Sequence, residues 1–269
     1  MTHMIYVVPS LKAKEKLQSE GKAWAESQGF TYVPRGKRTI QDLMDEYGED
    51  FLVYSSRGPQ IDRPEGSHFF SLNMAELRIQ NLRKGQRDHL LEALIGRGSS
   101  HQPLSVLDCT CGFGADAAVA SFGLPAGSRV DALEVSPLLE AVTSWGFSHF
   151  VHKKDDVTAA LRRISLSRGD YRDYLLSDEG PVYDVLYFDP MFQRPVEASC
   201  QFQPVRAIME HGGLTRDLIE RALQKARRRV VIKERDFRQL CRDFPEVTLY
   251  GGKYSRIGYA VLECDSWKK

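Results

Sequence analysis

The stretch VLDCTCGFGADA, residues 106–117, decides the expected fold. Residues 104–109 are mostly apolar and predict a strand, and residues 115–122 predict a helix directly after the glycine-rich turn. Glycines at such a strand-to-helix turn let the backbone approach a bound ligand closely. The stretch therefore predicts a nucleotide-binding turn. Its candidate contacts are Asp108, Gly112, Gly114, Ala115 and Asp116.

Outward from this turn, strand and helix patterns alternate along the chain. The expected strands are 104–109, 129–134, 164–168, 184–189 and 229–233, and the expected helices are 115–122, 137–150 and 215–226. Such alternation predicts a parallel sheet with helices on both faces. Two more strand patterns, 247–250 and 259–263, predict an antiparallel hairpin. We expect an α/β domain over residues 68–269 with a Rossmann-like, seven-stranded, mostly parallel sheet, which is the layout of class I methyltransferases.

Residues 1–67 predict a small N-terminal α/β unit. Its expected strands are 4–8, 30–33 and 51–54, and its expected helices are 11–28, after Ser10 as N-cap, and 40–47, after Thr39.

Two basic sets are candidate RNA contacts. The helical pattern 73–94, which Gly85 interrupts, carries Arg78, Arg83 and Lys84. The second set is Arg227, Arg228 and Arg229. Both sets are candidate contacts to a phosphate backbone. The alternative for the first set is an ordinary solvated helix face. The alternative for the second set is cations at the end of a helix, where the helix dipole favours them.

Composition excludes few function classes. With 37 basic and 36 acidic side chains, the net charge of +1 neither supports nor excludes a nucleic-acid partner. The five cysteines lack the paired spacing of a zinc site, so we expect free thiols and no metal. There is no signal-peptide pattern, and no apolar run approaches the roughly 20 residues that cross a bilayer. We expect a cytoplasmic protein without a membrane partner.

Acids at strand ends favour S-adenosylmethionine over a dinucleotide, although GFGADA by itself also fits a NAD-binding turn. Asp108 would place negative charge beside a pyrophosphate, whereas S-adenosylmethionine has no phosphate and carries a positive ammonium and sulfonium. Glu134 can accept the ribose hydroxyls of either cofactor. Strand-end capping is the alternative for both acids.

Two further acids have open roles. Asp116 is either a contact to the methionyl part of the cofactor or a first-turn acid favoured by the helix dipole. Asp170, after the strand 164–168, either accepts from the adenine amine or caps a loop.

The run Asp189-Pro190-Met191-Phe192 follows the strand pattern 184–189 and predicts the catalytic centre. Ligands of open α/β sheets lie beyond the carboxyl ends of the strands. The Asp189 carboxylate and the Pro190 carbonyl can accept from a planar exocyclic amine, Asp189 can take its proton, and a base can stack on Phe192. The run resembles the (Asp/Asn)-Pro-Pro-(Tyr/Phe) signature of amino-methyltransferases; a strand-end turn with a packed phenylalanine is the alternative.

The combination of LDCTCGFGADA, Glu134 and DPMF resembles the family of ribosomal RNA small subunit methyltransferase J, over roughly residues 67–233. The resemblance implies a class I enzyme that uses S-adenosylmethionine to methylate the N2 amine of a guanine in small-subunit rRNA, with rRNA or the small ribosomal subunit as its partner. The family's cofactor contacts carry over to Ala115, Asp116, Glu134, Val135, Gly169, Asp170 and Asp189.

Departures from the family's pattern leave the substrate open. Residues 113–116 lack the arginine of the family's Leu-Gly-Arg-Asp turn, Gly169 and Asp170 stand in place of two serines, Gln193 replaces a proline, and residues 1–67 match only loosely. The alternatives are a methyltransferase acting on another RNA, a protein or a small molecule, a non-catalytic RNA-binding or assembly module that keeps a nucleotide pocket, and a nicotinamide-dependent oxidoreductase.

Overall fold

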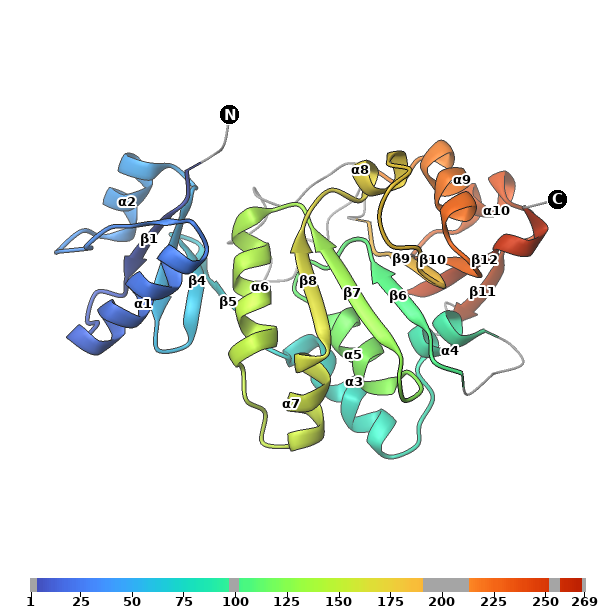
Figure 1. The fold of residues 1–269 in the computed structure, drawn as a ribbon, viewed down its shortest axis with the longest axis horizontal. Helices are drawn as coiled ribbons and strands as arrows, with labels where there is room; N and C mark the ends of the chain where they lie inside the picture. The colour runs from blue at the N-terminus through green and yellow to red at the C-terminus, as the bar shows by residue number, and fades with distance from the viewer. Residues whose placement is uncertain (1–3, 97–101, 191–212, 252–256, 268–269) are drawn as a thin grey trace. The chain divides into compact units, whose positions relative to one another are not determined.

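The computed structural model describes residues 4–96, 102–190, 213–251 and 257–267, whose elements are labelled in Figure 1. These residues form two compact units. The first contains residues 4–71 and 136–150, and the remaining described residues form the second. The first unit therefore combines the N-terminal residues with a later segment, 136–150. The two domains expected from the sequence, 1–67 and 68–269, stay a proposal.

A five-stranded sheet in the order β2-β1-β3-β4-β5 forms the first unit. Its strands are β1 (Tyr6–Pro9), β2 (Thr31–Tyr32), β3 (Phe51–Ser55), β4 (Gly58–Arg63) and β5 (Gly66–Phe69). Its helices are α1 (Glu15–Ser27), α2 (Ile40–Tyr47) and α6 (Pro137–His149). Strand β1 is parallel to β2 and β3, whereas β4 is antiparallel to β3 and β5. The sheet is therefore mixed, with an antiparallel half formed by β3, β4 and β5.

The alternating side chains of β3 pack against two different helices. Phe51 and Val53 share a core with Leu43 of α2. The ring of Tyr54 lies against Gly21 of α1, where a Cβ atom would approach it to 3.0 Å. Successive strand side chains point to opposite faces, so α1 and α2 cover opposite faces of β3. Helix α6 packs against β4.

A seven-stranded sheet in the order β11-β12-β10-β9-β6-β7-β8 forms the second unit. Its strands are β6 (Ser105–Asp108), β7 (Arg129–Glu134), β8 (Ile164–Arg168), β9 (Val185–Phe188), β10 (Arg229–Glu234), β11 (Thr248–Gly251) and β12 (Gly258–Glu263). Neighbouring strands are parallel except that β12 runs antiparallel to β10 and β11. The expected seven-stranded sheet with a C-terminal antiparallel hairpin is confirmed.

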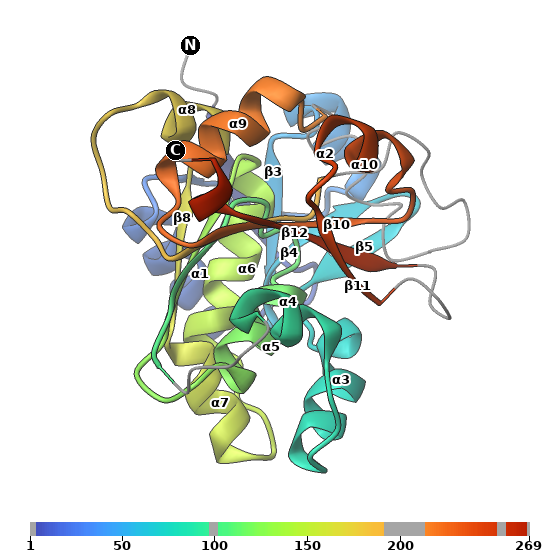
Figure 2. The same ribbon diagram turned by 90° about the vertical axis from the view of Figure 1, so that its right-hand side faces the viewer.

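Helices cover both faces of this sheet, as Figure 2 shows. One face carries α3 (Asn73–Arg83), α4 (His89–Ile95), α5 (Ala115–Gly123) and α7 (Asp155–Arg162). The other carries α8 (Tyr171–Leu176), α9 (Arg216–Lys225) and α10 (Arg238–Asp243). On the second face, Ile219 and Leu223 of α9 pack with Leu186, Phe188 and Val230 of the central strands. Burial on both faces explains why β9 is continuously apolar.

Sequence patterns locate the strands of the second unit and most helix starts to within one residue, and α1 is the exception. Helix α1 begins at Glu15 and not after Ser10, because the Ala13 N–H donates to the Ser10 carbonyl in a separate turn. The expected break at Gly85, with φ of +74°, is confirmed and separates α3 from α4. The patterns do not predict β4, β5, α7, α8 or α10, which are short or polar. Among the described residues, no helix is long and apolar enough to cross a membrane.

Candidate active site

The carboxyl ends of four neighbouring parallel strands hold the acids that the sequence predicts for the site. Asp108 ends β6, Glu134 ends β7, Asp170 follows β8 by two residues, and Asp189 directly follows β9. The chain runs outward from β6 to β8 and then returns to β9 on the other side of β6. Ligands of open α/β sheets bind where the strand order reverses, which places Asp108 and Asp189 at the centre of the site.

The turn after β6 is hydrogen-bonded to both neighbouring strand ends. Gly112 and Gly114 have φ of +54° and +74°, a conformation that strains other residues. The Gly112 N–H donates to Oε2 of Glu134 at 2.8 Å, and the Asp189 N–H donates to Oγ1 of Thr110 at 2.6 Å. One oxygen of Glu134 therefore organises the turn, in addition to the ribose contact expected of it.

Five charged side chains form a continuous ion-pair chain that ends at Asp189. Arg78 donates to both oxygens of Asp88, at 2.7 and 2.8 Å, and to Oδ1 of Asp116 at 2.5 Å. Lys233 Nζ donates to Oδ2 of Asp116 at 2.8 Å and to Oδ2 of Asp189 at 2.7 Å. These contacts join α3, α4, α5, β10 and the residue after β9. We call Asp88, Arg78, Asp116, Lys233 and Asp189 the ion-pair chain.

Asp116 is the most buried member of the ion-pair chain, and three donors converge on its carboxylate. Its side chain is 9% exposed, and the Tyr187 hydroxyl adds a third hydrogen bond at 2.7 Å. Burial raises the pKa of Asp116, but Lys233 and Arg78 lower it more, so the pKa lies well below its usual range. Burial lowers the pKa of Lys233, yet Asp116 and Asp189 outweigh it and hold that pKa above its usual value. Both groups are therefore charged at neutral pH.

Asp189 has the opposite shift. Burial, with a contribution from the Asp116 carboxylate, raises the pKa of Asp189 to about 6, although Lys233 opposes the rise. A carboxyl group that titrates near neutral pH can both accept a hydrogen bond and take up a proton.

The charge balance of the site fits a cationic cofactor. Asp108 is 2% exposed, and burial together with Asp116 and Asp189 raises its pKa well above the usual value. A sulfonium or ammonium group beside Asp108 would supply the missing positive charge, whereas a pyrophosphate would add negative charge. The cluster of buried carboxylates at the strand ends therefore fits S-adenosylmethionine better than a dinucleotide. In the described part of the chain, no group of three or more His, Cys, Asp or Glu side chains could hold a metal ion.

The other expected cofactor contacts lie at the same edge of the sheet. Ala115 opens α5, Val135 follows Glu134 with 36% of its surface exposed, and the Gly169 N–H donates to the Glu134 carbonyl at 3.0 Å. Asp170 N-caps α8 by accepting from the Arg172 N–H at 2.8 Å, and it also pairs with the Arg172 guanidinium. Asp170 therefore caps the start of α8, and its contact to the adenine amine stays a proposal.

The first basic set divides into one internal and two surface residues. Arg78 belongs to the ion-pair chain, so its guanidinium is engaged by Asp88 and Asp116 within the protein. Arg83 and Lys84 are exposed at the end of α3, where Arg83 pairs with Asp156. These two remain proposed RNA contacts.

The second basic set lies at the opposite edge of the sheet from Asp189. Arg229 begins the six-residue strand β10, about 20 Å of strand length, and Lys233 near its other end reaches the site. Arg228 and Arg229 pair with Asp184 and Glu263, each at 3.4 Å, and the Arg229 side chain is only 13% exposed. The structure therefore does not bring Arg227, Arg228 and Arg229 to the active site. Nor do they close a helix, because α9 ends at Lys225.

The expected catalytic run is described as far as Pro190. Met191 and Phe192 lie outside the described residues, so base stacking on Phe192 stays a prediction. Pro190 is described and partly buried directly after Asp189.

Sequence reasoning missed Lys233 and Tyr187. Lys233 interrupts the apolar run of β10, and a lysine is rarely buried unless it is paired. A cation inside an apolar strand pattern is therefore the signal that could have identified Lys233. Tyr187 gives no comparable signal, because tyrosine is common in buried strands.

Comparison with known proteins gives related sequences for most of the chain. A family model described as "Putative SAM-dependent methyltransferase" matches residues 67–257. The "Uncharacterized protein YpiP" of Bacillus subtilis is 28% identical over 230 residues, which cover 85% of this chain and 88% of that protein. A protein of Thioalkalivibrio sulfidiphilus named ribosomal RNA small subunit methyltransferase J is 31% identical over 229 residues, covering 82% of this chain and 84% of that protein.

A solved structure supports the fold. The crystal structure of a SAM-dependent methyltransferase from Neisseria gonorrhoeae superimposes with a TM-score of 0.62 at 19% identity, covering 96% of this chain and 95% of that chain. At this identity the likeness concerns the fold alone, whereas the charges at the strand ends and the sequence relatives independently point to the same cofactor.

Proposed function

The chain belongs to the family of S-adenosylmethionine-dependent methyltransferases, and we propose that its substrate is the exocyclic N2 amine of a guanine in small-subunit rRNA. The cofactor supplies an electrophilic methyl group bound to a positively charged sulfur. The observation that carries the proposal is the Asp189 carboxylate, which lies where the strand order reverses and whose pKa is raised by burial to about 6. The name of the Thioalkalivibrio relative supports the choice of rRNA.

Asp189 acts on the amine in this mechanism. The lone pair of a planar exocyclic amine is delocalised into the base, and a carboxylate that accepts its N–H bond draws the nitrogen towards a tetrahedral shape. Lys233 engages Oδ2, so we assign Oδ1 to the amine and the Pro190 carbonyl to its second N–H. As the N–C bond forms and the C–S bond breaks, the nitrogen becomes cationic and its proton passes to Asp189. S-adenosylhomocysteine and the methylated amine result.

Other residues of the site hold and align the reactants. We assign Asp108 to the positive methionyl groups and Glu134 to the ribose hydroxyls, because both carboxylates lie at strand ends beside the glycine turn. Alignment of nitrogen, methyl carbon and sulfur contributes much of the rate, since held reactants have large effective molarities.

The pH dependence of the rate is expected to report Asp189. Because the carboxylate is the active form and its pKa is raised to about 6, kcat/KM falls tenfold per pH unit well below pH 6 and levels off above it. A Lys233→Met variant loses the cation that opposes the rise, so its acid limb moves to higher pH by about one unit or more. Methyl transfer from radiolabelled cofactor, measured between pH 5 and 9, checks both profiles.

Two controls keep this pH prediction specific. Lys233→Arg retains the charge and is expected to keep the acid limb near its original pH, and exposed Lys153→Met leaves the profile unchanged. An acid limb that stays in place in Lys233→Met, with the variant folded, would exclude Lys233 as the positioning residue for Asp189.

The substrate is tested by mass spectrometry of small-subunit rRNA fragments from cells with and without the gene. The proposal expects one guanine to lose a single methyl group in the deletion strain and to regain it on complementation. If all rRNA fragments are identical in the two strains, the rRNA proposal fails, and the purified enzyme should then be assayed on other RNAs, proteins and small molecules.

A further inference from the structure

Three consecutive ion pairs connect Arg78 on α3 to Asp189 in the candidate active site. The Arg78 guanidinium donates to Oδ1 of Asp116 at 2.5 Å. Lys233 Nζ then bridges Asp116 and Asp189, with hydrogen bonds of 2.8 and 2.7 Å. The charges alternate in sign along this series, so each group stabilises the charge of its neighbours. All four side chains belong to the second unit.

The Arg78 end of the series is anchored to the start of a helix. Arg78 donates through Nε and Nη2 to the two oxygens of Asp88, at 2.7 and 2.8 Å, and such a bidentate pair fixes the orientation of a guanidinium. Asp88 is itself held as the N-cap of α4, where it accepts from the Leu90 N–H at 3.0 Å. Arg78 therefore presents its remaining nitrogen to Asp116 from a fixed position.

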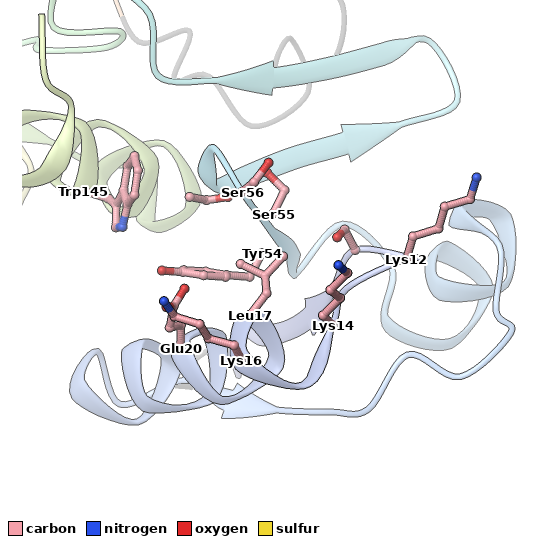
Figure 3. A pocket seen from close by; sticks show the side chains of 11 residues that line it. Lys12, Lys14, Lys16, Leu17, Glu20, Tyr54, Ser55, Ser56 and Trp145 are labelled. Atoms are coloured by element: carbon pink, nitrogen blue, oxygen red, sulfur yellow. Dashed lines mark hydrogen bonds and ion pairs between the residues drawn. The ribbon is translucent and has the colours of Figure 1, made fainter.

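Burial lets the charges of this series act strongly on one another. The side chains of Asp116, Lys233 and Arg78 are 9%, 14% and 26% exposed. Charges in such surroundings are screened little, whereas water and salt screen charges on the surface. Figure 3 shows exposed cations of the second kind around a surface pocket of the first unit: Lys12, Lys14 and Lys16. A change of charge at Arg78 is therefore expected to reach the site.

The ionisable groups that face Asp189 come from three strands and one helix. They are Lys233 and Glu234 of β10, Asp116 of α5, Asp108 of β6 and the Tyr187 hydroxyl of β9. Among these described groups, Lys233 is the one cation. Because Asp116 and Asp189 share Lys233, any group that compensates the charge of Asp116 also affects Asp189.

We infer that Arg78 is a positioning residue for Asp189: it holds and compensates Asp116, which shares Lys233 with Asp189. The inference rests on the proposed function, in which Asp189 contacts the substrate amine. Without Arg78, the Asp116 carboxylate keeps Lys233 as its cationic partner and competes for it more strongly with Asp189. Arg78 thus acts on the reaction without touching a reactant.

The test measures the protonation of Asp189 directly. Full-length protein is labelled with ¹³C at the aspartate carboxyl groups and titrated by NMR, and the signal of Asp189 is the one that is lost in Asp189→Asn. An Arg78→Gln variant removes the cation and leaves Asp116 less compensated, so the titration midpoint of Asp189 is expected to rise by about half a pH unit. Arg78→Lys retains the charge and is expected to keep the midpoint close to that of the wild type.

An Asp116→Asn variant tests the same series with the opposite sign. It removes a carboxylate and leaves Lys233 to Asp189 alone, so the midpoint of Asp189 is expected to fall by about one pH unit. A site that merely loosens would lower the midpoint in both variants, because exposure to water returns a raised carboxyl pKa towards its ordinary value. Opposite shifts therefore distinguish a positioning role from a purely structural one.

A matched control uses the other paired arginine of α3. Arg83 contacts Asp156, whose side chain is 51% exposed, so Arg83→Gln removes the same charge outside the ion-pair chain and should leave the midpoint of Asp189 unchanged. The inference is overturned if Arg78→Gln leaves the midpoint in place or lowers it, or if Arg83→Gln raises it equally. An unchanged midpoint with a raised KM for RNA would assign Arg78 to a phosphate contact instead.

A second variant covers the case in which Arg78→Gln does not fold. Asp88→Asn/Arg78→Gln removes the carboxylate that would lose its partner, and asparagine still caps α4. Asp116 is again left less compensated, so the midpoint of Asp189 is again expected to rise. A midpoint that stays in place or falls in the folded double variant overturns the inference.

Failure of this inference differs from failure of the proposed function, because the titration needs no substrate. If gene deletion removes an rRNA methyl group and Arg78→Gln leaves the midpoint of Asp189 in place, only the role of Arg78 is wrong. If gene deletion leaves rRNA methylation intact while the midpoint shifts as expected, the proposed substrate is wrong and the coupling of Arg78 to Asp189 stands.

Discussion

An Asp189→Ala variant is expected to lose methyl transfer by about 100- to 10,000-fold while still binding S-adenosylhomocysteine. The loss follows because Asp189 is both the proposed acceptor for the substrate N–H and the proposed acceptor of the departing proton. The fold should persist, because Lys233 keeps its hydrogen bond to Asp116 when the Asp189 carboxylate is removed. Single-turnover methylation and calorimetric titration with S-adenosylhomocysteine measure the two quantities separately.

Two further variants sharpen this experiment. Asp189→Asn keeps the shape and one acceptor oxygen but cannot take a proton at neutral pH, so a rate between those of the wild type and Asp189→Ala separates hydrogen bonding from proton transfer. Asp236→Ala removes an exposed carboxylate that follows β10 at the same edge of the sheet and pairs with Arg238, and it should leave the rate unchanged. If rRNA methylation persists undiminished in cells carrying only Asp189→Ala, Asp189 does not act in catalysis.

The largest stability loss is expected for Asp116→Ala. This substitution removes the carboxylate that contacts both Lys233 and Arg78, whose side chains are only 14% and 26% exposed. Lys233 keeps Asp189 and Arg78 keeps Asp88, so the expected cost in the free energy of unfolding is about 3 kcal/mol, the lower end of the range for a broken buried ion pair. Because the pKa of Asp116 is lowered, its stabilisation is present at neutral pH and lost as the pH falls below the ordinary carboxyl range. Urea unfolding at neutral pH measures the loss.

A surface ion pair provides the control for Asp116. Asp156 also contacts an arginine of α3, Arg83, but its side chain is 51% exposed. Asp156→Ala should therefore change the urea midpoint far less than Asp116→Ala, since water and salt screen exposed pairs. Equal losses in the two variants would show that the ion-pair chain stabilises the domain no more than its surface contacts do.

Much of the site was predictable because its residues stand at recognisable positions along the chain. Asp108, Glu134 and Asp189 each end or follow an apolar strand pattern, and the carboxyl ends of parallel strands meet at one edge of a sheet. Gly112 and Gly114 stand in the turn between a strand and a helix, where a positive φ is needed. Local sequence is sufficient for such residues, because strand direction alone determines which edge they occupy.

Other roles depended on contacts between distant segments. The sequence of α3 shows Arg78 as one of several basic residues, and only the packing of α3 against α5 makes it a partner of Asp116. Arg229 has the same appearance in the sequence, but it begins β10 and lies at the edge opposite Asp189. A charge pattern carries no information about which residues far along the chain will face it.

By itself, the sequence determined the parallel sheet, the glycine turn and the row of strand-end acids, because hydrophobic periodicity and strand direction are local properties. Only the tertiary structure decided that Lys233 joins Asp116 to Asp189, and hence that one carboxyl group has a lowered pKa and the other a raised one. The physical reason is that a pKa depends on burial and on charges within a few ångströms. Those neighbours come from β10, α3 and α5, which meet at Asp116 only when the chain has folded.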